Sequence, residues 1–183
     1  AATIIARRSQ LLNRLTGKVA MVLVEQPLAE VERRLRPFGA ALSIAAVNAS
    51  SSTVVAGDKV AADELLATLT AEGVECRKIV AENASHCAQV EAILPELAEH
   101  WQSLRPRPAR LPFYSTVTGT TLAGGELDAA YWCRNLRQTV RLDLALERLG
   151  HDGYGVFVEL SAHPVLVQAL TESSAERGGL VVG

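Results

Sequence analysis

The chain has 183 residues, 49% of them hydrophobic, which is enough for the core of one domain, or of one domain with a small inserted lobe. Its 18 basic and 20 acidic residues are interspersed and give a formal net charge of −2, so neither nucleic acid nor an anionic membrane is expected as a partner. The three cysteines lack close spacing, which argues against a disulfide framework and a four-ligand zinc site and fits a reducing cytoplasm.

The first residues predict a helix that is already under way where the sequence starts. There is no initiator methionine, no signal-peptide layout and no apolar run long enough to span a membrane. We therefore expect the chain to be a piece of a longer polypeptide. The apolar residues that share one face of this helix are Ile4, Ile5, Leu11, Leu12 and Leu15.

Arg8 falls on the same apolar face, four residues after Ile4 and three before Leu11. A guanidinium group keeps its charge and is costly to bury alone. An inward Arg8 therefore implies an anionic partner, either from the protein or from a ligand. The alternative is an arginine that lies at the rim of the apolar stripe and extends its head into solvent.

Residues 18–81 alternate between strand and helix periods in a clear order. We expect strands at 19–24, 42–47, 53–56 and 74–80, with helices at 27–36 and after Asp58. Asp58 can cap the second helix, and Gly73 is suited to end it. The order βαββαβ is that of a ferredoxin-like lobe.

His86 is expected in the first turn of an amphipathic helix. The apolar positions of that helix are Val90, Ile93, Leu94, Leu97 and Trp101, and Ser85 or Asn83 can cap it. The positive end of the helix dipole opposes protonation of the ring, so the imidazole would be neutral and able to act as a base. The alternative is a histidine that only packs or caps. Cys87 would face elsewhere and serve packing.

Downstream of Pro95, which should kink or restart that helix, the sequence predicts the closing elements of an α/β layer fold. We expect a strand at 113–117, a helix at 140–149, a strand at 156–160 and a final helix from Val165. Asn135 lies in a segment, 131–137, whose Tyr-Trp pair should anchor a loop. The chain contains no Gly-x-Ser-x-Gly elbow, phosphate loop, dinucleotide fingerprint, His-Glu-x-x-His or Cys-x-x-Cys.

Taken together, these segments resemble the acyltransferase domain of modular type I polyketide synthases and, more distantly, the malonyl-CoA:acyl-carrier-protein transacylases of fatty acid synthesis. The similar segments run nearly from end to end of the chain. They are 7–12 (RRSQLL), 46–48 (AVN), 54–58 (VVAGD), 84–90 (ASHCAQV), 112–119 (PFYSTVTG), 131–137 (YWCRNLR) and 157–166 (FVELSAHPVL). Departures from the family pattern include Ala162 and Thr139, each where proline is usual.

The resemblance implies an α/β fold with an α/β-hydrolase-like large subdomain, residues 1–17 and 82–183, and an inserted ferredoxin-like small subdomain, residues 18–81. It implies that His86 activates a serine nucleophile and that Arg8 pairs with the free carboxylate of a malonyl-type acyl group. Asn135 matches the position whose backbone carbonyl orients the histidine. The serine, in a Gly-His-Ser-x-Gly elbow, would precede Ala1, so we expect the 183 residues alone to be inactive.

The resemblance also implies the substrates. Acyl-CoA would be the donor, and the acceptor would be the phosphopantetheine thiol of an acyl carrier protein, with no bound cofactor or metal. A ketosynthase domain and its linker would be neighbours. In the family, the choice of extender unit is associated with the residues before the histidine: His-Ala-Phe-His with malonyl and Tyr-Ala-Ser-His with methylmalonyl. In this chain Asn83 and Ser85 occupy the first and third of these positions. Ser85 favours methylmalonyl, and Asn83 fits neither pattern. The alternatives are a standalone transacylase and a non-catalytic carrier-protein docking module.

Overall fold

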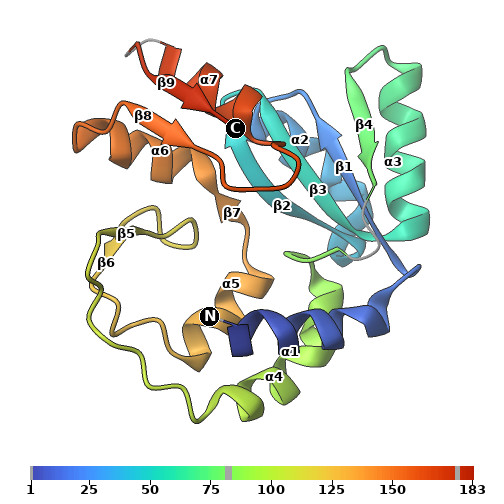
Figure 1. Cartoon of the computed structure of the whole chain (residues 1–183). Coiled ribbons are helices and arrows are strands. Elements are labelled where there is room, and N and C mark those ends of the chain that lie inside the picture. The colour runs from blue at the N-terminus through green and yellow to red at the C-terminus, as the bar shows by residue number, and fades with distance from the viewer. Residues whose placement is uncertain (1, 81–83, 176–177) are drawn as a thin grey trace.

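A computed structural model describes residues 2–80, 84–175 and 178–183 of the chain. Its centre is a five-stranded sheet with the strand order β4-β1-β3-β2-β7 (Figure 1). The elements of residues 18–81 are β1 (Val19–Val24), α2 (Leu28–Leu35), η2 (Arg36–Ala41), β2 (Leu42–Ala49), β3 (Ser52–Asp58), α3 (Lys59–Ala71) and β4 (Cys76–Ile79). The predicted βαββαβ order is confirmed. β1 pairs antiparallel with β3 and β4, and β3 pairs antiparallel with β2.

The cap predicted at Asp58 is also present. Its carboxylate accepts hydrogen bonds from the backbone N–H groups of Val60 at 2.9 Å and Ala61 at 3.1 Å. These are two of the N–H groups that have no partner within the helix itself, so the cap fixes where α3 begins.

The sheet is buried on both faces, and β1 shows why its sequence is almost wholly apolar. Ala20, Val22 and Val24 belong to the core under α2 and α3, whereas Val19 and Leu23 belong to the core on the opposite face. Alternate side chains of a strand point to opposite faces, so a strand covered on both sides has no set of alternate positions at which polar side chains could reach water.

The second core is formed by helices that are far apart in sequence. They are α1 (Ala2–Leu12) with the short η1 (Asn13–Leu15), η3 (Ala88–Ile93), α4 (Leu94–Trp101) and α5 (Ala129–Arg137). Pro95 restarts the helix as predicted, because it sits in the first turn of α4, where its missing N–H costs nothing. The prediction for Ile5 is wrong: it is 56% exposed, while Ile4 is 7% exposed, so the buried stripe of α1 is narrower than expected.

The remaining elements are β5 (Phe113–Tyr114), β6 (Thr121–Leu122), β7 (Val140–Arg141), α6 (Leu142–His151), β8 (Val156–Val158), α7 (Val167–Ser174) and β9 (Leu180–Val182). The helix expected from residue 140 begins two residues later, because Val140 and Arg141 pair in parallel with Ala46 and Val47 of β2. The expected strand at 113–117 is reduced to β5. β9 was not predicted; it pairs in parallel with β8, beside α7 in Figure 1.

Of the helices in the described part of the chain, none is both long and apolar enough to cross a bilayer.

Candidate active site

His86 lies in a loop just before η3, not in the first turn of a helix. Cys87, and not Ser85, is the N-cap residue of η3, and no side-chain cap hydrogen bond is formed by it; the Ser85 hydroxyl contacts Arg8 instead. The predicted capping by Asn83 lies outside the described residues. The backbone of His86 has φ = +62°, in the left-handed region that residues other than glycine seldom occupy. Such a conformation costs about 1–3 kcal/mol and persists only where the surroundings fix it.

The C-terminal end of α5 provides that fixation. The backbone N–H of His86 donates to the carbonyl of Leu136 at 2.9 Å, and the ring Nδ1 lies 2.8 Å from the carbonyl oxygen of Gln138. Cys87 is fully buried, as expected for a packing residue, and anchors the next position of the loop. The sequence pattern ahead of Val90 predicted a helix at His86 that does not form. Contacts between His86 and residues about 50 positions away in sequence override the local helical preference.

The Gln138 carbonyl decides which nitrogen of His86 is basic. Gln138 ends α5 with extended backbone, φ −81° and ψ 158°, and this turns its carbonyl away from the direction of the helix. A carbonyl oxygen can only accept, so Nδ1 carries the hydrogen in this bond and Nε2 of the neutral ring is the free acceptor. The sequence-based assignment of the orienting carbonyl to Asn135 is therefore wrong; Gln138 holds the ring.

Asn135 instead contacts Arg8 through its side chain. Arg8 of α1 donates from one terminal nitrogen to Asn135 Oδ1 at 3.3 Å and from the other to Ser85 Oγ at 3.4 Å. The Tyr-Trp pair predicts a loop around it, but Asn135 lies in helix α5. Four of the residues singled out from the sequence, Arg8, Ser85, His86 and Asn135, thus lie at one place.

Arg8 has no carboxylate partner among the residues that the structure describes. Its neighbours on the same helix differ: Arg7 pairs with Glu96 at 2.8 Å, and Arg14, just beyond the helix, pairs with the other oxygen of Glu96 at 2.6 Å. The two contacts of Arg8 are long and go to neutral oxygen atoms. An inward Arg8 implies an anionic partner, and the described residues provide no carboxylate for it.

The electrostatic setting keeps His86 neutral, but for a different reason from the predicted one. Burial of the ring lowers the pKa of His86 below its ordinary 6.5; the Gln138 carbonyl opposes this, and the positive charge of Arg8 adds to it. The helix end beside the ring is the negative end of α5, which favours imidazolium. Burial also lowers the pKa of Arg8, whose ordinary value of 12.5 is so high that the group stays charged near neutral pH.

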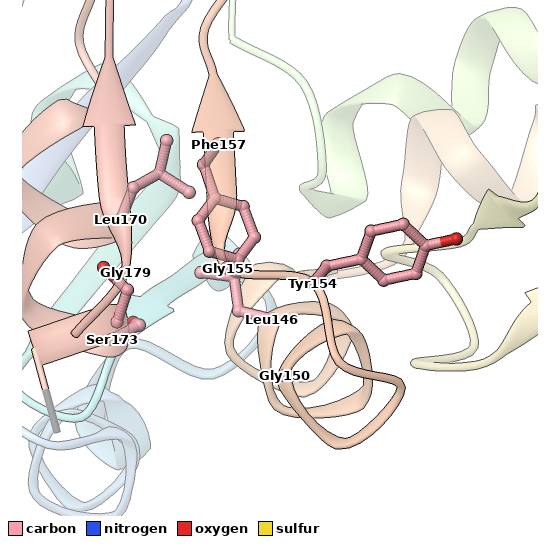
Figure 2. Close-up of a pocket in the computed structure, with 9 residues that line it drawn as sticks. Leu146, Gly150, Tyr154, Gly155, Phe157, Leu170, Ser173 and Gly179 are labelled. Atoms are coloured by element: carbon pink, nitrogen blue, oxygen red, sulfur yellow. The ribbon is translucent and has the colours of Figure 1, made fainter. Parts of the chain in front are cut away.

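Three cavities formed by described residues lie outside this cluster, because none of them is lined by Arg8, Ser85, His86 or Asn135. Figure 2 shows one between α6, β8 and α7, where Phe157, Leu146 and Leu170 converge; its volume of about 10 Å³ is room for a single water. A groove of about 460 Å³ runs between α1, Leu104 and Trp132. Another, of about 480 Å³, is lined by Arg137, Gln138, Thr139 and the Ser43 and Ile44 positions of β2.

The residues that sequence reasoning missed act through their backbones. Leu136 and Gln138 contribute only carbonyl oxygens, which every residue has, so no residue type signals the role. The basic and amide residues at the end of α5 were a partial signal, because they are typical of a helix C-terminus. The last carbonyls of a helix lack partners within it and can accept hydrogen bonds from elsewhere. Within the described ranges, no group of three or more metal-ligating side chains occurs.

Comparison with known proteins adds independent information. The acyl transferase domain family matches residues 1–180. The spectinabilin polyketide synthase system protein NorA' of Streptomyces orinoci is 46% identical over the whole chain, and the erythronolide synthase EryA2 of Saccharopolyspora erythraea is 44% identical over 98% of it. The chain spans only 5% of the length of each of these relatives.

Solved structures agree with these matches. The acyltransferase domain from module 8 of the salinomycin polyketide synthase superposes with a TM-score of 0.95 at 43% identity; the match covers all of this chain and 44% of that one. A loading acyltransferase from the avermectin modular polyketide synthase gives 0.94 at 39% identity, covering all of this chain and 58% of that one. The malonyl CoA-acyl carrier protein transacylase of Coxiella burnetii, at 20% identity and a TM-score of 0.86 over 97% of this chain and 58% of that one, shares the fold.

Proposed function

This chain belongs to the acyl transferase domain family, and from that premise we propose that it supplies the general base and the acyl-carboxylate site of a polyketide synthase acyltransferase. The reaction would move a malonyl-type acyl group from coenzyme A to the phosphopantetheine thiol of an acyl carrier protein, through an acyl-serine intermediate. Residues 1–17 and 82–183 would belong to an α/β-hydrolase-like subdomain and residues 18–81 to a ferredoxin-like one, in the cytoplasm.

The observation that carries this proposal is a guanidinium, Arg8, that has no carboxylate partner among the described residues and lies beside an imidazole, His86, whose pKa is lowered by burial. His86, with Nδ1–H on the Gln138 carbonyl, presents Nε2 to accept a proton from a serine hydroxyl and later return one to the leaving thiolate. The imidazolium that forms in between is stabilised by the same carbonyl and by the negative end of α5. The positive charge of Arg8 works against it, so the ring returns its proton readily.

Arg8 fits the free carboxylate of a malonyl-type acyl group. Its fork of donors matches a carboxylate in two-point geometry, and an ionised acceptor makes shorter and stronger bonds than the neutral oxygens that contact it at 3.3 and 3.4 Å. An acetyl group would leave the charge unpaired, so the site would discriminate against it.

The size of Ser85 supports methylmalonyl as the extender unit. Its Oγ lies 3.4 Å from a terminal nitrogen of Arg8, so the side chain borders the proposed carboxylate site, where a small residue would leave room for an α-methyl group. Asn83, the other residue expected to influence this choice, lies outside the described residues, and its role stays a prediction.

The nucleophilic serine of this proposal comes from residues outside the chain, because the 183 residues contain no Gly-x-Ser-x-Gly sequence. The proposed partners, an acyl carrier protein and a ketosynthase domain with its linker, are supported by the size of the relatives, which are large synthase proteins. A non-catalytic docking module is the contrasting function; it would be favoured by an Arg8 paired with a structural carboxylate, whereas within the described residues Arg8 contacts neutral oxygens.

The test is a direct competition between methylmalonyl-CoA and malonyl-CoA for acylation of the intact acyltransferase that contains this chain, followed by mass spectrometry. We expect faster methylmalonyl loading, loss of loading in His86→Gln, and no acyl adduct on the 183 residues alone. Undiminished loading in His86→Gln, or a stable acyl adduct on these residues alone, contradicts the mechanism. A malonyl preference contradicts the extender assignment only.

A further inference from the structure

The segment that follows α5 is fastened to the edge strand of the five-stranded sheet by a side chain as well as by its backbone. The Thr139 hydroxyl donates to the carbonyl of Ile44 in β2 at 2.8 Å. The next two residues form β7 and pair with Ala46 and Val47. Thr139 therefore makes the first contact of this segment with β2, one residue ahead of the ladder.

The site of that contact is irregular. The register of β2 against β3 shifts between Ile44 and Ala46, so Ala45 is an extra residue on β2. A bulge of this kind interrupts the ladder and redirects the backbone groups next to it. The Thr139 hydroxyl donates a hydrogen bond to the Ile44 carbonyl beside the bulge, ahead of the point where β7 begins to pair with β2.

Thr139 is linked to His86 by one rigid unit. The Gln138 carbonyl that accepts from His86 Nδ1 belongs to the peptide group that joins Gln138 to Thr139, and a peptide group is planar. On the Gln138 side, the N–H of the preceding peptide group donates to the Arg134 carbonyl at 2.8 Å. On the Thr139 side, the hydroxyl is bonded to Ile44. These two ties flank the Gln138–Thr139 peptide group and restrict its rotation, and with it the direction of the carbonyl.

We propose that Thr139 is a positioning residue for the base of the proposed acyltransferase: its hydroxyl bond to Ile44 sets the Gln138–Thr139 peptide plane, and that plane selects the Nδ1–H tautomer of His86. The proposal rests on the proposed function only for its effect on turnover, because the tautomer of His86 is a property of the chain itself. The βαββαβ lobe, through β2, thereby governs which nitrogen of His86 is basic.

The experiment compares Thr139→Val, which keeps the shape but removes the hydroxyl, with Thr139→Ser, which keeps the hydroxyl. Thr53→Val is the matched control, because the Thr53 hydroxyl makes a similar 2.9 Å bond to a backbone carbonyl, that of Gln26, which is not part of the Gln138–Thr139 segment. Long-range ¹H–¹⁵N NMR of the ¹⁵N-labelled chain reports the tautomer of each of the four histidines, and His86→Gln assigns the His86 signals.

We expect the Nδ1–H tautomer to predominate at His86 in the wild type, Thr139→Ser and Thr53→Val, and to become the minor form in Thr139→Val. In the intact acyltransferase, Thr139→Val should lower kcat roughly ten- to a hundredfold with KM for acyl-CoA nearly unchanged. A wild-type tautomer in Thr139→Val, or an equal change in Thr53→Val, overturns the proposal.

If Thr139→Val does not fold, Thr139→Ala gives the same reading: loss of the Nδ1–H form supports the proposal and its retention overturns it. The result is separable from the proposed function. If His86→Gln keeps full acyl loading, the proposed function fails, whereas the dependence of the tautomer on Thr139 is judged by NMR alone.

Discussion

Replacing Arg8 by methionine tests the carboxylate site, because it removes the charge and keeps most of the apolar stem. In the wild type the head has two long contacts with neutral oxygens and, among the described residues, no carboxylate partner. A bound carboxylate would add two charge-assisted hydrogen bonds, each worth about 1.5–3 kcal/mol. Allowing for desolvation of both charges, we expect the variant to lose about 3 kcal/mol of transition-state stabilisation.

A loss of that size corresponds to a fall of about 100-fold in kcat/KM for malonyl-type CoA esters. Acylation by acetyl-CoA should rise instead, since no unpaired guanidinium remains beside the methyl group. The assay is acyl loading of the intact acyltransferase with each ester in turn. Arg8→Lys should fall between the wild type and Arg8→Met, because an ammonium keeps the charge but not the fork.

Arg7→Met is the matched control, one residue away on the same helix. Arg7 forms a partly exposed ion pair with Glu96, so its loss should cost at most about 1 kcal/mol of folding stability and leave the choice of ester unchanged. The free energy of unfolding of Arg8→Met should lie within about 1 kcal/mol of that of the wild type, because Arg8 forms no ion pair within the described residues. The reasoning is refuted if Arg8→Met keeps the wild-type ratio of malonyl to acetyl loading, or if its main effect is a loss of stability greater than that.

Three further predictions follow from the geometry. Because the pKa of His86 is lowered on folding, the unfolded chain binds more protons than the native one between that pKa and 6.5; stability should therefore rise with pH across this window, and His86→Gln should abolish the rise in thermal melts. Ser85→Phe should fill the space beside Arg8 and shift the competition from methylmalonyl-CoA toward malonyl-CoA; an unchanged ratio would show that Ser85 does not set the size of the acyl pocket. Asp58→Ala removes both cap bonds of α3 and should cost about 0.5–2 kcal/mol in denaturant unfolding without changing the His86 tautomer.

The outcome for residues 18–81 shows where sequence reasoning is strong. Strand and helix periods, the Asp58 cap and the glycine after α3 are local signals, and each formed the element it predicted. Boundaries moved by one or two residues where pairing extended or shortened a strand, as at β2 and β4. β9 and the short β7 were missed, because a strand of two or three residues has too short a pattern to be seen without its partner.

From the sequence alone we predicted which side chains would gather at the site: the apolar stripe of α1 included Arg8, and the pattern before Val90 together with the family resemblance singled out Ser85 and His86. It also predicted a neutral imidazole, although by way of a helix dipole that the structure does not provide. How the imidazole is held becomes visible only in the folded chain. The hydrogen bonds from His86 Nδ1 to the Gln138 carbonyl and from Thr139 to β2 join residues that are far apart in the chain. The left-handed backbone of His86 is held by contacts of the same long-range kind. Backbone carbonyls carry no residue-type signal, so the partner of a histidine ring becomes known only once folding has brought α5 and its C-terminal peptide groups against it.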